Sequence, residues 1–261
     1  MITLDLHREV RKNPLVIEGL DAIPDEERAV ALSHWRSRMA SEYASARVFA
    51  GLVPQLMRAG LAHGHIARVS AMVGQELDHG LLCARVVAAL GADPQEASPE
   101  LVDIPAHEDA SPVEAVLRNV ISVGCCSETV AVALVSTERA QATAPALKEV
   151  LERILSDEAK HSRFGWRLVA ELAPRLDAKM RERLTAYLVA AFEHQIAFHG
   201  AFLRWPAQTD RAVAIGAADG PLNWSIFVDT MLEVVVPGLE RHGLGARRAW
   251  DAATARVGTT N

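Results

Sequence analysis

Apolar residues recur at helical spacing along most of the 261-residue chain, and no long stretch alternates apolar and polar residues as a half-buried strand would. Proline, glycine and acidic residues divide this pattern into segments, as helix starts and stops do. The pattern predicts seven helices, over about residues 25–59, 65–90, 112–142, 145–173, 177–205, 222–236 and 246–255. We therefore expect an all-α protein.

Local signals set the limits of these helices. Acidic residues from Asp25 onward occupy the first turn of the first helix, where they complement the helix dipole. Ser111 followed by Pro112 has the form of an N-cap with proline at the first helical position. Residues 92–111 and 206–221 show no clear period, and we expect loops there.

The predicted elements suggest one large domain with three parts. Residues 1–24 lack a sustained period and are expected to form a strap on the main body. Four long helices over residues 25–173 are expected to form the functional bundle. Residues 174–261 supply further helices that we expect to pack on the bundle within the same domain.

Composition excludes several classes of protein. The formal net charge of −6 argues against a nucleic-acid surface, which needs clustered lysine and arginine. No uninterrupted apolar run approaches the roughly 18 residues that span a membrane, so no membrane segment is expected. The first residues lack the apolar core of a signal peptide. The odd count of three cysteines argues against a disulfide framework, which favours the reducing cytoplasm.

A Glu-x-x-His motif occurs in two of the predicted helices, as Glu76/His79 and as Glu158/His161. Residues three apart on a helix project from the same face, one turn apart. A carboxylate and an imidazole side by side suit a divalent transition metal. A single glutamate in the preceding helix, Glu42 or Glu128, completes each set, so the sequence predicts six ligands for two metal ions.

The positions of these residues along the helices agree with a common site. Glu42 lies 18 residues before Gly60, and Glu76 lies 16 residues after it. The two glutamates of the second pair of helices each lie 15 residues from Thr143. Since each residue of a helix advances it by about 1.5 Å, all four glutamates are expected at mid-height of antiparallel hairpins. The long connection over residues 92–111 can return along a whole helix, as a crossover requires.

Chance is the competing explanation. With 10 histidines and 33 acidic residues, about one acid-x-x-His arises at random, and a lone match on a helix is usually a solvated pair. Here, however, the run after Glu128 (residues 129–135) carries no charge. Burying several carboxylates without compensation is very costly, and cations are the usual remedy. The pattern therefore favours a metal site.

The chain resembles the ferritin-like di-iron carboxylate superfamily over about residues 25–173. The resemblance implies a four-helix bundle with a long crossover between its second and third helices. It implies two iron ions, with manganese as an alternative metal. The ligands it implies are Glu42, Glu76, His79, Glu128, Glu158 and His161, with the four glutamates acting catalytically together with the metals. It also implies that Asp157 accepts a hydrogen bond from a ligating imidazole.

Two positions depart from the patterns of this superfamily. Gln75 stands where the first motif would carry the counterpart of Asp157. Ile154 stands where amine N-oxygenases, which the chain otherwise resembles, carry an additional histidine ligand, so N-oxygenation is not expected.

Tyr43 points about 100° away from Glu42 around the helix, which disfavours a tyrosyl-radical site of the ribonucleotide reductase kind.

The residues one turn from each ligand indicate the surroundings of the metals. We expect a largely apolar pocket there, lined by Trp35, Ala46, Phe49, Met72, Cys83, Gly124, Cys125 and Gly165. Gly80, Gly124 and Gly165 each lie four residues from a ligand. Glycine inside a helix costs up to about 1 kcal/mol, so these glycines indicate either space for a substrate or a close contact between helices. The two cysteines are more often plain packing residues.

The resemblance implies oxygen chemistry. We expect O2 activation for the oxidation or oxygenation of a small, fairly apolar organic substrate. A separate ferredoxin or reductase would supply electrons, since the chain has no flavin, nicotinamide or iron–sulfur motif. Two alternatives stay open: a ferroxidase or iron-storage protein, and a di-manganese catalase or peroxide scavenger. The residues beyond 173 fit a self-contained enzyme or a homodimer better than a storage cage.

Overall fold

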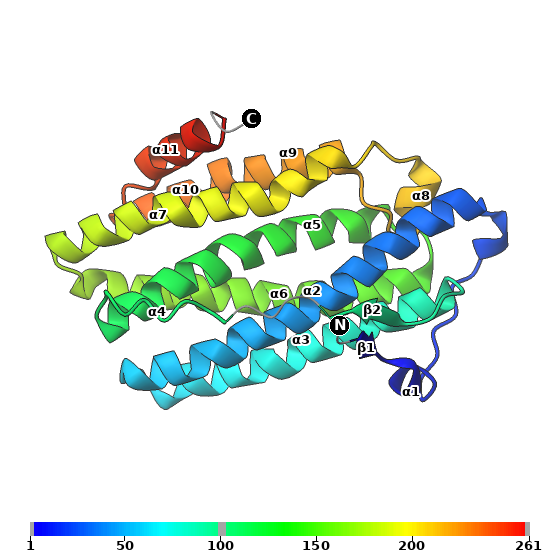
Figure 1. Cartoon of the computed structure of the whole chain (residues 1–261), viewed down its shortest axis with the longest axis horizontal. Coiled ribbons are helices and arrows are strands. Elements are labelled where there is room, and N and C mark those ends of the chain that lie inside the picture. The colour runs from blue at the N-terminus through cyan, green and yellow to red at the C-terminus, as the bar shows by residue number, and fades with distance from the viewer. Residues whose placement is uncertain (1–2, 99–102, 259–261) are drawn as a thin grey trace. The chain divides into compact units, whose positions relative to one another are not determined.

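Helices account for most of the molecule. The computed structural model describes residues 3–98 and 103–258. It contains 77% helix and 2% strand, which confirms the all-α class (Figure 1). Contacts divide the chain into two compact units. Unit 1 comprises Met1–Pro105, Val135–Asp157 and Gln208–Asp219, and unit 2 comprises Ala106–Leu134, Glu158–Ala207 and Gly220–Asn261.

Two long helices form the main part of unit 1, α2 (Asp25–Arg58) and α3 (His63–Ala89), and they pack side by side (Figure 1). The turn between them contains Gly60, whose φ of +64° lies in the left-handed region that favours glycine. So short a connection makes the pair an antiparallel hairpin. Both helices begin and end within two residues of the predicted limits.

The core of unit 1 lies between this hairpin and the first half of α6 (Pro145–Leu172). Trp35 and Met39 of α2 are fully buried there, together with Val87 of α3 and Ile154 of α6. Apolar side chains at helical spacing on three helices thus share one core, as the periodicity of the sequence predicts.

Unit 1 also contains a small sheet that the sequence pattern did not predict. Strand β1 (Thr3–Asp5) pairs antiparallel with β2 (Gln95–Ala97), with Leu4 opposite Glu96. Strands of three residues are too short to show an alternating pattern. The pairing attaches the start of the chain to the segment after α3, next to the short helix α1 (His7–Val10).

The expectation of a loop over residues 206–221 was wrong in part, because α8 (Asp210–Ala214) lies within it and packs on α2. The Thr209 side chain caps this helix by accepting a hydrogen bond from the Ala212 N–H at 3.2 Å. The Trp35 indole donates to the Ile215 carbonyl at 3.0 Å. A five-residue helix is too short to give a periodic signal, so tertiary contacts define it.

The helical run predicted over 112–142 belongs to unit 2 up to Leu134, and its residues from Val135 onward belong to unit 1. It consists of α4 (Pro112–Val120), a π-helical segment (Ile121–Ser127) and α5 (Glu128–Gln141), without a break. The Glu114 N–H donates to the Ser111 hydroxyl at 3.3 Å, which confirms the predicted N-cap. The π-helical segment was not predicted, because a segment of seven residues inside a long helix is too short to show a period of its own.

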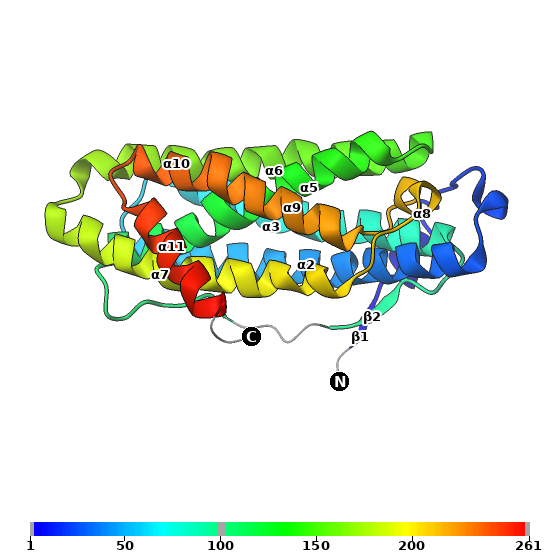
Figure 2. The same ribbon diagram turned by 90° about the horizontal axis from the view of Figure 1, so that it is seen from above.

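Unit 2 also contains the part of α6 from Glu158 onward, together with the helices α7 (Ala178–His199), α9 (Gly220–Thr230), α10 (Val236–Glu240) and α11 (Ala246–Gly258). The helix predicted over 177–205 ends as α7 at His199 and continues as a 3₁₀ turn, Gly200–Arg204. A second π-helical segment, Met231–Val235, joins α9 to α10. Helix α11 packs against α7 (Figure 2).

Two helical runs, Pro112–Gln141 and Gly220–Glu240, are long and apolar enough to cross a membrane by length and composition. The expectation of no membrane segment rested on uninterrupted apolar residues, whereas small and hydroxyl-bearing residues lengthen both of these runs without adding charge. About half of each apolar window, 50% and 44%, is buried inside the protein. Buried core helices meet the same criteria, so these runs are weak evidence for a membrane.

Candidate metal-binding clusters

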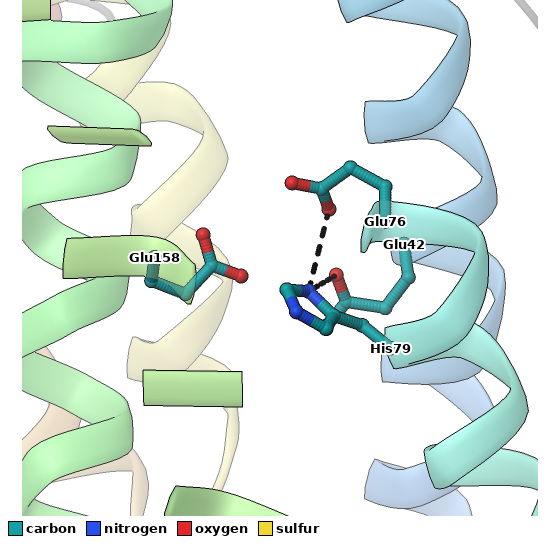
Figure 3. Close-up of side chains that lie close together, drawn as sticks. All are labelled: Glu42, Glu76, His79 and Glu158. Atoms are coloured by element: carbon teal, nitrogen blue, oxygen red, sulfur yellow. Dashed lines mark ion pairs between the residues drawn. The ribbon is translucent and has the colours of Figure 1, made fainter. Parts of the chain in front are cut away.

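The first cluster of ligand residues lies in unit 1 and consists of Glu42 from α2 with Glu76 and His79 from α3. Their ligand atoms lie within 4.8 Å of one another. His79 Nδ1 is 3.8 Å from Glu42 Oε2 and 3.8 Å from Glu76 Oε2. Figure 3 shows both ion pairs as dashed lines; Glu158, drawn in the same view, belongs to the second cluster. All three residues of the first cluster are buried.

Asp157 lies on the other side of the His79 ring. Its Oδ2 is 3.5 Å from His79 Nε2, so the two ring nitrogens face different carboxylates. Gln75 donates to Asp157 Oδ1 at 3.1 Å, and Arg153 Nη2 lies 3.4 Å from Asp157 Oδ2. A carboxylate beside one ring nitrogen holds the imidazole in one orientation and leaves the other nitrogen for a ligand. Asp157 therefore has the surroundings of a residue that orients His79.

The second cluster lies in unit 2 and repeats the composition of the first. Glu128 is the first residue of α5, and Glu158 and His161 lie one turn apart on α6. His161 Nδ1 lies 3.2 Å from Glu158 Oε2 and 3.6 Å from Glu128 Oε2. The ligand atoms of these three residues also lie within 4.8 Å of one another, and all three residues are buried.

Both clusters can hold a metal ion. Carboxylate oxygens and imidazole nitrogens are suitable donors for iron, manganese and zinc, and the donor set alone does not select among them. The four glutamates are at most 9% exposed, so an ionised form of each needs a compensating positive charge close by. A divalent cation supplies that charge, so the residues present fit a metal ion.

Hydroxyl groups support the second cluster. Thr129 follows Glu128, and Ser162 follows His161; their hydroxyl oxygens are 2.9 Å apart. The Trp166 indole donates to the Thr129 hydroxyl at 3.1 Å. The side chains next to the ligands therefore connect α5 to α6 within unit 2.

The glycines beside the ligands serve close packing. A Cβ atom added to Gly165 would lie 2.7 Å from the carbonyl carbon of Gly124, and one added to Gly124 would lie 2.9 Å from Gly165 Cα. In unit 1, a Cβ atom on Gly80 would lie 2.7 Å from the Tyr43 ring. Of the two explanations left open by the sequence, these distances favour close contact between helices at all three positions.

The other residues expected near the metals are buried: Trp35, Ala46, Phe49, Met72, Cys83 and Cys125. All three cysteines are free, and burial raises the pKa of the Cys126 thiol to about 12. Burial also raises the pKa of Cys83 and of Cys125 well above the ordinary value, and in Cys83 the Glu42 carboxylate adds to the effect. Protonated thiols at neutral pH suit packing rather than metal ligation.

One charged network beside the first cluster was missed by sequence reasoning. Arg38 contacts both carboxylate oxygens of Glu138 at 2.7 Å, and His34 Nε2 lies 3.4 Å from the same carboxylate. Burial works to lower the pKa of Arg38, but Glu138 raises it above the ordinary value, with a smaller contribution from Glu42. Arg38 lies one turn before Glu42 on α2, and this spacing was the available signal.

No protein-family model matches this chain, and no curated protein matches it either. The chemistry of the clusters must therefore be inferred from their residues.

Proposed function

We propose that the six residues of the two clusters form one di-iron centre in a ferritin-like four-helix bundle. The protein would use this centre to activate O2 and oxidise a small, fairly apolar organic molecule. The observation that carries the proposal is the repetition of one ligand set, a glutamate followed by Glu-x-x-His, as a buried cluster in each unit. Chance does not readily produce this set twice, and burial makes an unliganded set costly.

The continuity of α6 supports a shared centre. Asp157, beside His79 of the first cluster, and Glu158, of the second, are consecutive residues of this helix. Consecutive Cα atoms are about 3.8 Å apart, so the chain itself keeps the two residues close. The ferritin-like topology agrees with the short connection between α2 and α3 and with the long segment between α3 and α4.

Bound iron would supply sites for O2 and electrons for its reduction, and an external reductase or ferredoxin would restore those electrons. The residues of the chain have separate tasks. The four glutamates would neutralise the metal charge as ligands, and His79 and His161 would each bind one metal. Asp157 would hold the His79 ring in place. The apolar residues around the clusters, such as Phe49 and Met72, would limit access of water.

Metal analysis tests the site. The purified protein is expected to hold two iron ions per chain, and Glu128→Gln is expected to lower this number. Glu149→Gln, which changes an exposed glutamate of α6, is the matched control and should leave two. Unchanged metal content in Glu128→Gln would contradict the assignment. Mössbauer spectra test the shared centre, because two irons bridged by a carboxylate couple magnetically and two separate irons do not.

Oxygen chemistry needs its own measurement. The reduced di-iron protein is expected to consume O2 without storing further iron. Mineralisation of hundreds of irons per oligomer would favour iron storage instead. Rapid disproportionation of peroxide by the manganese-loaded protein would favour a catalase.

A further inference from the structure

Unit 2 contains a cavity of about 580 Å³ that is formed by the end of α7, the 3₁₀ turn after it, α9 and α11. Its volume is within the range of about 300–1,000 Å³ that is typical of small-molecule sites. The residues that line it are Ile196, Ala197, Gly200, Ala201, Leu203, Arg204, Trp224, Val228, Trp250, Thr254, Val257 and Gly258. None of these residues belongs to either metal-binding cluster.

The side chains that line the cavity are mostly apolar, and one of them is charged. Its walls are aliphatic and aromatic side chains, and the hydroxyl of Thr254 donates within its own helix, to the Trp250 and Asp251 carbonyls at 3.0 and 3.1 Å. Arg204 is the one charged residue of the lining, and its side chain is exposed. Within residues 3–98 and 103–258, no carboxylate forms an ion pair with Arg204.

Aromatic packing fixes the walls of the cavity. Phe227 packs against both tryptophans of the lining, with its ring centroid 5.3 Å from that of Trp224 and 6.2 Å from that of Trp250. The His199 ring stacks on Phe227 at 4.5 Å. Burial, with a smaller effect of His194, lowers the pKa of His199 to about 4, so His199 is neutral at pH 7. Arg204 therefore supplies the positive charge at the cavity.

We propose that this cavity binds an amphipathic anion, a carboxylate with an apolar chain of about ten carbons. The chain would occupy the apolar space against Trp224 and Trp250, and the carboxylate would pair with the Arg204 guanidinium, which is a suitable partner for it. An anion fits because the lining contains a cation and no acidic side chain. The site is separate from the metal-binding clusters, so its existence does not depend on the proposed function.

Decanoate is a suitable probe, with decanol and decyltrimethylammonium as neutral and cationic compounds of the same chain length. Binding to the full chain is measured by calorimetry and by the change in tryptophan fluorescence, since two tryptophans line the cavity. Decanoate is expected to bind more tightly than decanol, and the cationic compound most weakly. Equal affinities of all three, or no binding of decanoate at millimolar concentration, would overturn the proposal.

The variant Gly200→Leu tests whether decanoate binds in this cavity. A Cβ atom at Gly200 would meet nothing within 4 Å, and its φ of −57° suits any residue, so the leucine side chain can enter the cavity without strain. Decanoate affinity is expected to fall at least tenfold. Gly64→Leu, at an exposed glycine of α3 where an added Cβ atom also meets nothing within 4 Å, is the control and should leave affinity unchanged. Equal affinity in Gly200→Leu and the control would place decanoate elsewhere.

The variant Arg204→Gln tests whether the guanidinium charge contributes to decanoate binding. Decanoate affinity is expected to fall about threefold to tenfold, as for a partly solvated ion pair, while decanol affinity stays the same. Arg68→Gln, an exposed arginine of α3, is the control. A parallel loss for decanoate and decanol would contradict a role for the guanidinium. Circular dichroism of each variant shows that it is folded.

Discussion

The two clusters have the same composition, two glutamates and one histidine, but different interactions support them. Around the first cluster, charged side chains predominate: the Arg38–Glu138 pair lies one turn away, and Asp157 contacts His79. Around the second, the support is close packing of Gly124 on Gly165 and a chain of hydroxyl groups. A π-helical segment ends directly before Glu128, whereas Glu42 lies within an unbroken α-helix. The same set of two glutamates and one histidine can therefore be supported either by charged side chains or by close packing.

Arg38→Leu should have the largest effect. It leaves the Glu138 carboxylate buried without its guanidinium partner, which typically costs about 3–5 kcal/mol. Unfolding by urea should show this loss, and the first cluster should lose metal before the second. The double variant Arg38→Leu/Glu138→Leu should recover most of the stability because no buried charge is left alone. A loss below about 1 kcal/mol in the single variant would show that the pair does not stabilise unit 1.

The second-largest effect is expected from acid, which should weaken the Arg38–Glu138 pair beside the first cluster. Burial works to raise the pKa of Glu138, but Arg38 lowers it to about 2, below the ordinary value of 4.5. A lowered pKa in the folded state stabilises the protein above about pH 4.5, and this contribution is lost as pH falls from there towards 2. The loss should reach about 3 kcal/mol. The Leu/Leu double variant shares every other carboxylate, so parallel stability curves between pH 5 and 3 would rule out this contribution.

Gly165→Ala should have a smaller effect, on the second cluster. The added Cβ atom would lie 2.7 Å from backbone of Gly124, and overpacking of this kind costs about 1–3 kcal/mol. Gly74→Ala is the matched control, since this helical glycine of α3 has open space around it. It should stabilise the protein by up to about 1 kcal/mol. If Gly165→Ala also stabilised, the close contact between these glycines would be unimportant.

The long helices and the residues of both Glu/His clusters were predictable because their signals are local. A helix of about 30 residues repeats its apolar spacing many times, and Glu-x-x-His is read within one turn. The β1–β2 pair and α8 were missed because elements of three to five residues are too short to repeat an apolar spacing. The Arg38–Glu138 pair joins residues 100 apart in sequence, and no pattern in a single chain connects them. The π-helical segment before Glu128 leaves little trace in the sequence.

Asp157 and Glu158 are neighbours on one helix, so their side chains move together. Any rotation of α6 about its axis, or any slip along it, moves both side chains by the same amount. A rotation by one residue, about 100°, would remove Asp157 from His79 and, at the same time, Glu158 and His161 from Glu128. Loss of geometry in one cluster through α6 therefore entails loss in the other, so metal release driven by this helix would be cooperative.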